Sequence, residues 1–385
     1  MLLNYSQCFF YHFAIARYLA SYLHLLLNQE WMVYMDLVDE AIIQNESNEL
    51  DYNLFKPRIS VCGVGGGGSN TINRISKMNI RGANLIAFNT DNKHLKSMDS
   101  TIKRVLLGGS LTRGLGAGGF PTIGAKSAQY SKNEIISELK DSNLVFIAAG
   151  MGGGTGSGAA PVIAQSAKEL GAIVISIVTF PFALERIRLE TARNAIVELQ
   201  KFSDTLIIID NQRLVDMYPN LQLDQAFKVA DEVTSHAVVG ITETISTPSL
   251  INLDFADVNA ILKDGGLAMI SVGEGKGSDK VDEVVKSTLK NKLLDVNYEN
   301  SKGILLNIIG GEDLTLGEAN EIATRITDCA AENAQVIWGA RIDPRYNGKV
   351  EVVAIFTGVA SPSIIGTNED AAEDDDDMGI PKMMR

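Results

Sequence analysis

One glycine-rich segment constrains the fold of this chain more than any other part of its sequence. Residues 152–158 read GGGTGSG, directly after an apolar run at residues 144–149 and before a helix-like stretch at residues 159–170. A strand that ends in glycines and opens a helix is typical of a phosphate-binding loop, because bare backbone N–H groups approach an anion closely and the helix dipole favours its charge. The segment therefore predicts an α/β protein that binds a nucleotide through Gly152, Gly153, Gly154, Thr155, Gly156, Ser157 and Gly158.

This loop lacks the lysine of a P-loop. A P-loop reads G-x-x-x-x-G-K-[ST], and no glycine cluster of this chain matches that pattern. The phosphate charge would then be met by backbone N–H groups, the helix dipole and a metal ion. The simpler interpretation, a tight turn, requires only one or two glycines.

Two further glycine runs occur, GVGGGGSN at residues 63–70 and GLGAGG at residues 114–119. The first run satisfies G-x-G-x-x-G, and Asp91 lies near the position of a ribose-binding acid, so an NAD-dependent oxidoreductase is one alternative. A dinucleotide-binding fold has no use for two more phosphate loops, however. Three loops that converge on one phosphate chain are the better interpretation.

Six motifs, in order along the chain, resemble the tubulin/FtsZ superfamily, and FtsZ more closely than tubulin. They are the glycine run at residues 63–70 with Asn70, FNTD at residues 88–91, the glycine run at residues 114–119, GGGTGSG at residues 152–158, the Pro-Phe pair at residues 181–182 followed by Glu185, and NLDFAD at residues 252–257. The resemblance spans about residues 57–359. The GGGTGSG variant and the spacing after Glu185 look more archaeal than bacterial.

The resemblance implies a fold and a function. The fold is α/β, with an N-terminal doubly wound, mostly parallel sheet that forms a GTPase domain, a long central helix and a smaller α+β C-terminal domain. The function is that of a cytoplasmic GTPase that binds GTP or GDP with Mg²⁺, hydrolyses GTP and assembles head to tail with itself at the division site, on the inner face of the membrane. The alternative within the superfamily is a non-polymerising, regulatory GTP-binding paralogue that controls cell shape.

Composition agrees with a soluble cytoplasmic protein. The chain has 385 residues, 45% of them hydrophobic, and a formal net charge of −13. Because binding to nucleic acid requires clustered Lys and Arg, no nucleic-acid partner is expected. The three cysteines are too few and too scattered for a disulfide framework or a metal site built from side chains.

The pattern of apolar and polar segments divides the chain into five parts. They are an N-terminal extension that is poorly structured or partly helical (1–50), a GTP-binding domain (51–221), a central connecting helix (222–246), a catalytic-loop and C-terminal α+β domain (247–360) and a disordered acidic tail (361–385). Residues 8–27 are apolar but interrupted by Arg17 and two histidines, so no transmembrane insertion is expected. A membrane-surface helix and a start codon placed too early, before Met32 or Met35, are the two interpretations of the extension.

Short apolar runs predict ten strands. Six alternate with helices and so predict a parallel sheet, at residues 58–62, 84–88, 104–107, 144–148, 173–179 and 205–209. Four more follow at residues 267–273, 303–309, 335–340 and 349–357. A turn cluster at residues 343–348 predicts that the last two form a hairpin.

The resemblance assigns contacts to the nucleotide. The base would stack on Phe227 and be read by Asp231, and the i, i+4 spacing places both on one face of a helix. A carboxylate suits guanine because it accepts hydrogen bonds from both N1–H and the N2 amino group. Asn70 would also contact the base and Glu185 the ribose; the arginine expected four residues after Glu185 is Leu189 here, with Arg188 nearby. The phosphate contacts would include Gly66, Gly67, Ala117, Gly118 and Gly119, while Asn89 and Asp91 would hold phosphate-bound water or magnesium unless Asp91 is a solvated turn residue.

Asn252, Asp254 and Asp257 are the predicted catalytic residues. They follow the long helix, which spans roughly 30 Å, so they should lie at the opposite end of the molecule from the nucleotide. The resemblance implies that they complete the site of the next subunit in a filament; the alternative is that they only cap the following helix. The final seven residues, from Gly379 to Arg385, resemble a peptide that binds membrane-tether or regulator proteins.

Overall fold

The computed structural model describes residues 57–78, 80–217, 223–246, 251, 254–290, 301–328, 330–331 and 333–359. The chain divides after Lys56. The N-terminal extension, the acidic tail with its last seven residues and Asn252 lie outside the described residues.

Ten strands form one sheet in the order β3-β2-β1-β4-β5-β6-β7-β10-β8-β9. Every strand predicted from the sequence is present. The strands are β1 (Ile59–Val64), β2 (Ala83–Asn89), β3 (Lys103–Leu106), β4 (Leu144–Gly150), β5 (Ile173–Phe180), β6 (Thr205–Asp210), β7 (Gly266–Lys276), β8 (Gly303–Gly310), β9 (Gln335–Ile342) and β10 (Lys349–Thr357).

The pairings from β3 to β7 are all parallel, as is the pairing of β8 with β9. Only β10 runs against its two neighbours, β7 and β8. The mostly parallel sheet that we expected is therefore confirmed. The parallel first part joins the second through a short register of three residue pairs between β6 and β7.

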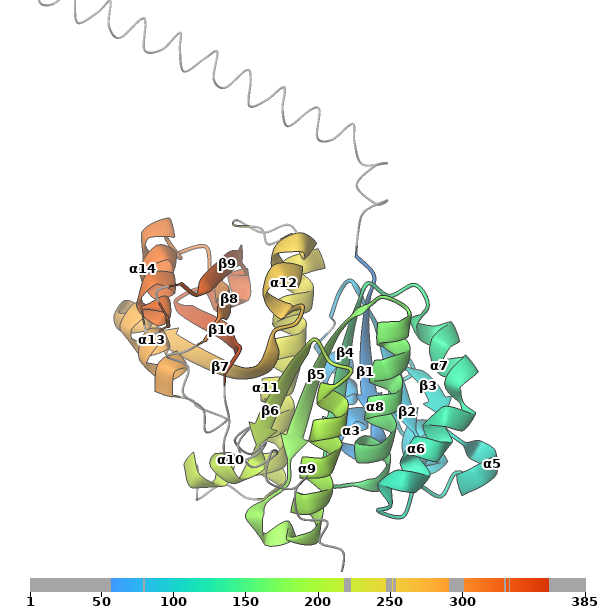
Figure 1. Cartoon of the computed structure of the whole chain (residues 1–385). Coiled ribbons are helices and arrows are strands. Elements are labelled where there is room, and N and C mark those ends of the chain that lie inside the picture. The colour runs from blue at the N-terminus through green and yellow to red at the C-terminus, as the bar shows by residue number, and fades with distance from the viewer. Residues whose placement is uncertain are drawn as a thin grey trace, which may run out of the picture. The chain divides into compact units, whose positions relative to one another are not determined.

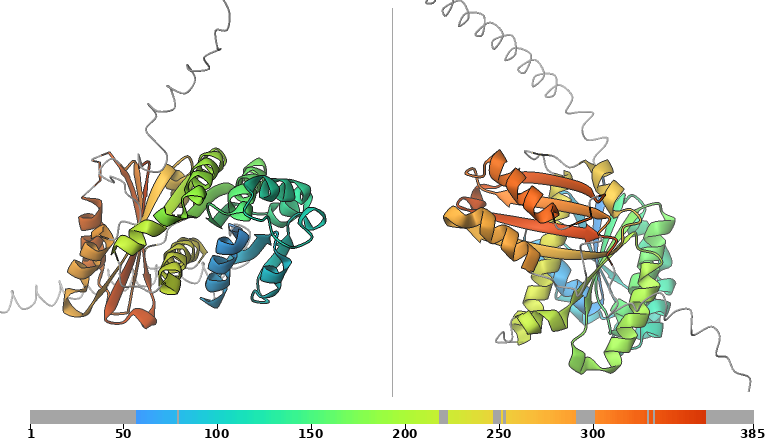
Figure 2. Two further views of the ribbon diagram at one scale, coloured as in Figure 1. Left: turned by 90° about the horizontal axis from the view of Figure 1, so that it is seen from below. Right: turned by 60° about the vertical axis from the view of Figure 1, so that its left-hand side comes forward.

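Helices cover both faces of this sheet (Figures 1 and 2). One hydrophobic core lies under the helices of one face and a second core under those of the other. The first face carries α6 (Pro121–Tyr130), α7 (Lys132–Leu139), α8 (Gly154–Glu169), α9 (Ile187–Gln200), α13 (Lys280–Lys290) and α14 (Leu316–Thr327). The second carries α3 (Gly65–Lys77), α4 (Asn92–Lys96), α11 (Leu223–Ser246) and α12 (Phe255–Leu262).

Burial on both faces explains why these strands read as continuous apolar runs. All six residues of β1 and the first six of β4 are buried. A crossover helix separates each parallel strand from the next, and such helices must lie on the sheet faces. The remaining short helices are α5 (Gly109–Thr112) and α10 (Asn211–Met217), both on loops that follow strands.

The helix α11 connects the two parts of the sheet. It has 24 residues, close to the predicted range, and packs on α3 as well as on the strands β7, β8 and β10. In the left view of Figure 2 the C-terminal strands lie between α11 on one side and α13 and α14 on the other. The second part is thus a smaller α+β layer, as expected.

The hairpin predicted between the last two strands is wrong. The strand β8 lies between β9 and β10, parallel to β9 and antiparallel to β10. The residues 343–348 therefore cross the end of β8, where the Asp343 N–H donates to Gly310 O over 2.8 Å. A turn signal marks a reversal of direction, but it does not say whether a third strand fits between the two it joins.

Candidate nucleotide-binding site

Two helix N-termini meet where β1 and β4 end. The helix α3 begins at Gly65 and α8 begins at Gly154, so both helices start inside the glycine runs, earlier than predicted. A Cβ atom on Gly65 would lie 2.8 Å from the Gly156 nitrogen, and one on Gly156 would overlap the Gly150 oxygen. Glycine is required at these positions because the two backbones touch.

The glycine run at residues 114–119 packs beside the start of α8. A Cβ atom on Gly154 would lie 2.8 Å from the Phe120 nitrogen and 2.9 Å from the Ala117 Cβ. Gly118 and Gly119 have φ angles of 62° and 83°, which favour glycine. The three loops therefore converge, as the sequence suggested.

A cavity of about 690 Å³ lies in front of the two helix N-termini. It brings together ten of the predicted nucleotide contacts: Gly66, Gly67, Asn70, Gly153, Gly154, Thr155, Gly156, Glu185, Arg188 and Asp231. Six further lining residues were not predicted as contacts, although Pro181 belongs to one of the six motifs: Gly150, Met151, Thr179, Pro181, Asn211 and Lys228.

The missed residues carry a signal that sequence reasoning could have used. Gly150 ends β4, Thr179 is the penultimate residue of β5, and Asn211 follows the last residue of β6. Parallel sheets bind ligands at the carboxyl ends of their strands. A single residue at the carboxyl end of a predicted parallel strand is therefore a candidate ligand contact, as the glycine runs are.

Several residues that were predicted to contact the nucleotide do not line the cavity that the described residues form, but lie next to it. The Ser157 hydroxyl accepts a hydrogen bond from the Gly152 N–H over 2.9 Å, which fixes the bend that precedes α8. Gly158 faces α6, and a Cβ there would overlap the Pro121 oxygen. The structure thus gives Gly152, Ser157 and Gly158 roles in shaping the loop and packing the helix.

Asn89 and Asp91 also make internal contacts. The Asp91 carboxylate accepts the N–H groups of Lys93 and His94 over 2.9 and 3.1 Å, so Asp91 is the N-cap of α4. Asn89 is buried and its Nδ2 lies 3.3 Å from Ser69 Oγ. Ala117, Gly118 and Gly119 complete the group of predicted contacts that lie outside the lining.

Asp231 on α11 also lines the cavity, next to α3. The Thr71 hydroxyl on α3 donates to its carboxylate over 3.0 Å, and the neighbouring pair Arg74–Glu232, at 2.9 Å, also links α3 to α11. Burial raises the pKa of the Asp231 carboxyl, although the Thr71 hydrogen bond opposes this shift. Phe227 lies four residues earlier on α11, and its side chain is outside the described residues.

A charged pair forms another part of the wall. The Arg188 guanidinium lies 2.6 Å from the Glu185 carboxylate, whose other oxygen accepts the Phe182 N–H over 3.1 Å. Leu189 instead packs against the hydrophobic core. Arg188 is therefore the basic residue at this wall, one position before the place where the resemblance expects an arginine.

The predicted catalytic aspartates lie far from this cavity. Asp254 and Asp257 form a reciprocal cap at the start of α12, with the Asp257 N–H donating to Asp254 over 2.7 Å and the Asp254 N–H donating to Asp257 over 3.3 Å. In Figure 1 α12 lies at the end of α11 opposite α10 and the glycine loops. The 24 residues of α11 span about 36 Å.

The segment that carries these aspartates is fixed to the second part of the sheet. Ile251 forms an antiparallel bridge with Ala340 on β9, with both backbone hydrogen bonds at 3.2 Å. Because the bridge lies three residues before Asp254, the capped helix start has a defined position relative to β9.

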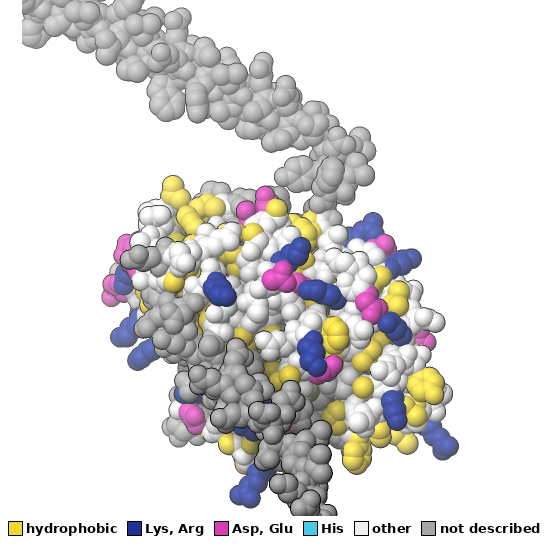
Figure 3. Space-filling view, viewed as in Figure 1, with side chains coloured by type: hydrophobic (Ala, Val, Ile, Leu, Met, Phe, Trp, Pro, Cys, Tyr) yellow, Lys and Arg dark blue, Asp and Glu magenta, His cyan; other side chains and the backbone are white. Residues whose placement is uncertain are grey.

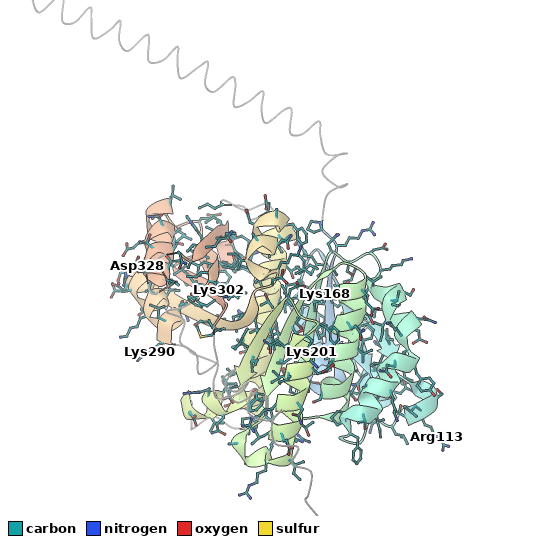
Figure 4. The ribbon with its side chains drawn as sticks, viewed as in Figure 1. Arg113, Lys168, Lys201, Lys290, Lys302 and Asp328 are labelled. Carbon is teal, nitrogen blue, oxygen red and sulfur yellow. The ribbon has the colours of Figure 1, made fainter. Side chains whose placement is uncertain are left out.

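Charges elsewhere on the surface are mixed. Figure 3 shows Lys and Arg side chains on this face interspersed with Asp and Glu. Lys168, which Figure 4 labels on α8, pairs at 2.6 Å with the buried Asp204 directly before β6, away from the cavity.

Within the described ranges no group of three or more His, Cys, Asp and Glu side chains could hold a metal ion. No helix of the described part is long and apolar enough to span a membrane.

Comparisons with known proteins agree with this geometry. Residues 58–219 match the model of the tubulin/FtsZ family GTPase domain, and residues 266–360 match that of the FtsZ family C-terminal domain. The cell division protein FtsZ 2 of Methanocaldococcus jannaschii is 52% identical over 339 residues, which cover 87% of this chain and 89% of that protein. The FtsZ 2 of Haloferax volcanii is 47% identical over 330 residues, which cover 85% of this chain and 82% of the relative.

Solved structures show the same relationship. An empty FtsZ dimer of M. jannaschii superposes with a TM-score of 0.78 at 40% identity, covering 88% of this chain and 99% of that one. CetZ1 of Haloferax volcanii, at 20% identity and a TM-score of 0.70, shares the fold. The comparisons thus agree with the convergent glycine loops, and this chain belongs to the tubulin/FtsZ family of GTPases, in its FtsZ branch.

Proposed function

We propose that this protein is a GTP-dependent filament protein of the cell-division ring that hydrolyses GTP between head-to-tail subunits. The observation that carries the proposal is that the cavity lies beside the first part of α11, at Lys228 and Asp231, whereas the aspartates begin α12 beyond the other end of this 24-residue helix, which continues for about 22 Å after Asp231. Neither end holds a complete hydrolytic site. Two subunits stacked head to tail would bring the two ends together.

The cavity supplies the phosphate-binding half. Its walls include the first residues of α3 and α8, whose N–H groups and dipoles favour an anion, and the Thr155 hydroxyl lies at the same place. Thr155 is held by a 2.7 Å hydrogen bond to Thr90. These contacts orient the phosphate chain without a lysine from a P-loop.

The part of the lining that α11 provides supports guanine as the base. Asp231 is a half-buried carboxylate whose charged form is disfavoured by burial. Two N–H donors of guanine would compensate that carboxylate, whereas adenine would place the acceptor N1 against it. Phe227 would stack on the base, Asn70 would contact it, and Glu185 with Arg188 would hold the ribose side.

The second half of the site is the start of α12. Each aspartate of the reciprocal cap uses one oxygen to accept an N–H group, so a second oxygen remains to orient water. We infer that Asp254 and Asp257, with Asn252, orient and polarise the attacking water in the site of the next subunit. Mg²⁺ bound with GTP would neutralise charge on the phosphates; because no cluster of acidic ligands occurs in the described part, phosphate oxygens and water would provide most of its ligands.

The remaining predictions concern location and partners. We propose that the filament forms in the cytoplasm at the division site, and that the last seven residues bind a membrane tether or a regulator. The solved FtsZ dimer is a relative in which self-association is seen.

Pelleting with GTP and Mg²⁺ tests the proposal. The wild-type chain should form GTP-dependent pellets, whereas the Asp257→Ala variant should still bind GTP and copolymerise but lose hydrolysis by about a hundredfold or more. Asp264→Asn is the control: it removes a carboxylate shortly after α12, at a position whose φ of 55° Asn also tolerates, and should hydrolyse GTP normally. Normal turnover by Asp257→Ala would contradict the role in catalysis, and GTP-bound monomers at high concentration would favour a regulatory, non-polymerising protein.

A further inference from the structure

His94 on α4 connects the cavity wall to the buried end of β2. Its Nε2 lies 3.1 Å from Asn70 Oδ1, and its Nδ1 lies 3.4 Å from Asn89 Nδ2. Asn70 lines the cavity, whereas Asn89 is 2% exposed. We propose that His94 is a positioning residue that fixes which end of the Asn70 amide faces the nucleotide, an inference that rests on the proposed nucleotide site.

The direction of the hydrogen bonds follows from one backbone donor. The Asp91 N–H can only donate, and it lies 3.2 Å from Asn89 Oδ1. The Asn89 amide therefore turns its Nδ2 toward Ser69 Oγ and toward the His94 ring. Because that NH₂ group is a donor, His94 Nδ1 must accept.

An imidazole that accepts at Nδ1 carries its hydrogen at Nε2 when it is neutral. The Nε2–H then donates to Asn70 Oδ1. With this oxygen engaged, the Asn70 Nδ2 group is the end left to contact a ligand as a donor. Asn70 thus suits an acceptor on the nucleotide, such as a ring nitrogen or carbonyl oxygen of guanine.

The surroundings of His94 hold this arrangement in place. The His94 N–H donates to Asp91 Oδ1 over 3.1 Å, so one residue caps the helix and also orients Asn89. Asn70 itself is exposed, where water would satisfy either orientation of its amide. Solvent alone does not favour one orientation of the Asn70 amide over the other. The hydrogen bond from His94 does.

Calorimetric titration of the full-length chain with GDP tests this role. We expect His94→Ala to weaken GDP binding about tenfold, the effect of losing roughly one hydrogen bond. His94→Gln retains an N–H donor of similar reach and should restore most of the affinity. Lys96→Ala, an exposed position on the same helix, should bind GDP like the wild type.

A double-mutant cycle separates positioning from a general loss of structure. If His94 acts through Asn70, the double variant His94→Ala/Asn70→Ala should bind GDP no more weakly than Asn70→Ala alone. Losses that multiply in the double variant would overturn the proposal, as would unchanged affinity in His94→Ala. A wild-type chain that binds no GDP would instead count against the proposed function as a whole.

Discussion

The strands β1 and β8 are buried along their whole length and run in the same direction, yet their carboxyl ends meet different surroundings. Directly after β1 the chain opens α3 at the cavity. After β8 the connection between β9 and β10 covers the end: the Glu312 N–H donates to Asn347 over 2.9 Å, and the Gly348 N–H donates to Asp313 over 3.0 Å. The same edge of one sheet is thus open in the first part and closed in the second.

The difference follows from topology. A purely parallel part leaves its strand ends to loops that lead into helices, and these loops are free to form a ligand site. Once the antiparallel β10 is inserted between β7 and β8, its connection must cross the end of β8. Lys280, which is 8% exposed, pairs with Asp313 at 2.8 Å and reinforces this closed end.

The largest effect on stability should come from replacing a glycine that packs against another backbone, and such glycines occur in both parts of the sheet: a Cβ atom on Gly275 would overlap the Lys280 oxygen, just as one on Gly158 would overlap the Pro121 oxygen. Gly158→Ala in the first part would overlap the backbone of α6 and should lower the free energy of unfolding by about 3 kcal/mol. The matched control, Gly317→Ala in α14, meets its nearest atom at 4.0 Å and should be neutral or stabilising by up to about 1 kcal/mol. Urea unfolding of both variants measures this, and equal effects would show that the contact with α6 does not require glycine at position 158.

The pH dependence of GDP binding should arise at the open end. Burial raises the pKa of Asp231, and the proposed contact with guanine requires the carboxylate, so we expect protons to compete with the nucleotide. Affinity should be constant near pH 7 and fall as pH decreases through the raised pKa of Asp231, approaching a tenfold loss for each further pH unit below it. The Asp231→Asn variant should bind weakly at all these pH values with a flatter profile; a wild-type profile that stays flat would remove Asp231 from the base site.

In the second part of the sheet, titration of His236 should affect the free energy of unfolding and leave GDP binding unchanged. The hydrogen bond to Glu351, 3.0 Å long, raises the pKa of His236 and links α11 to β10. A raised pKa means that this stability is fully present below the unfolded value of about 6.5 and is lost as pH rises through the folded value.

His236→Gln should therefore lower the free energy of unfolding by about 1 kcal/mol near pH 6 and by less near pH 9. Urea denaturation at both pH values measures the difference, with GDP affinity as the control. A deficit that is independent of pH would mean that the variant removes packing and no charged hydrogen bond.

Strand positions were predictable from the sequence because each buried strand is a short apolar run between polar or glycine-rich segments. Strand order was not, because β8 enters between β9 and β10 through long-range pairing that no local pattern records. The glycine loops were found because backbone contact excludes every side chain, which leaves a clear trace in the sequence. Thr179 and Asn211 were missed because the signal that they carry, one polar residue at a strand end, is weaker than a run of glycines.

The contact between Gly65 and Gly156 also has an energetic consequence. Each helix N-terminus carries a partial positive charge equivalent to about half an elementary charge, and two such ends adjoin here. Without a ligand these two positive ends repel each other inside the protein, and this repulsion is unfavourable for the folded state. We expect a phosphate chain bound in front of these two helix ends to act as their counter-ion, so that nucleotide binding raises the free energy of unfolding of the domain.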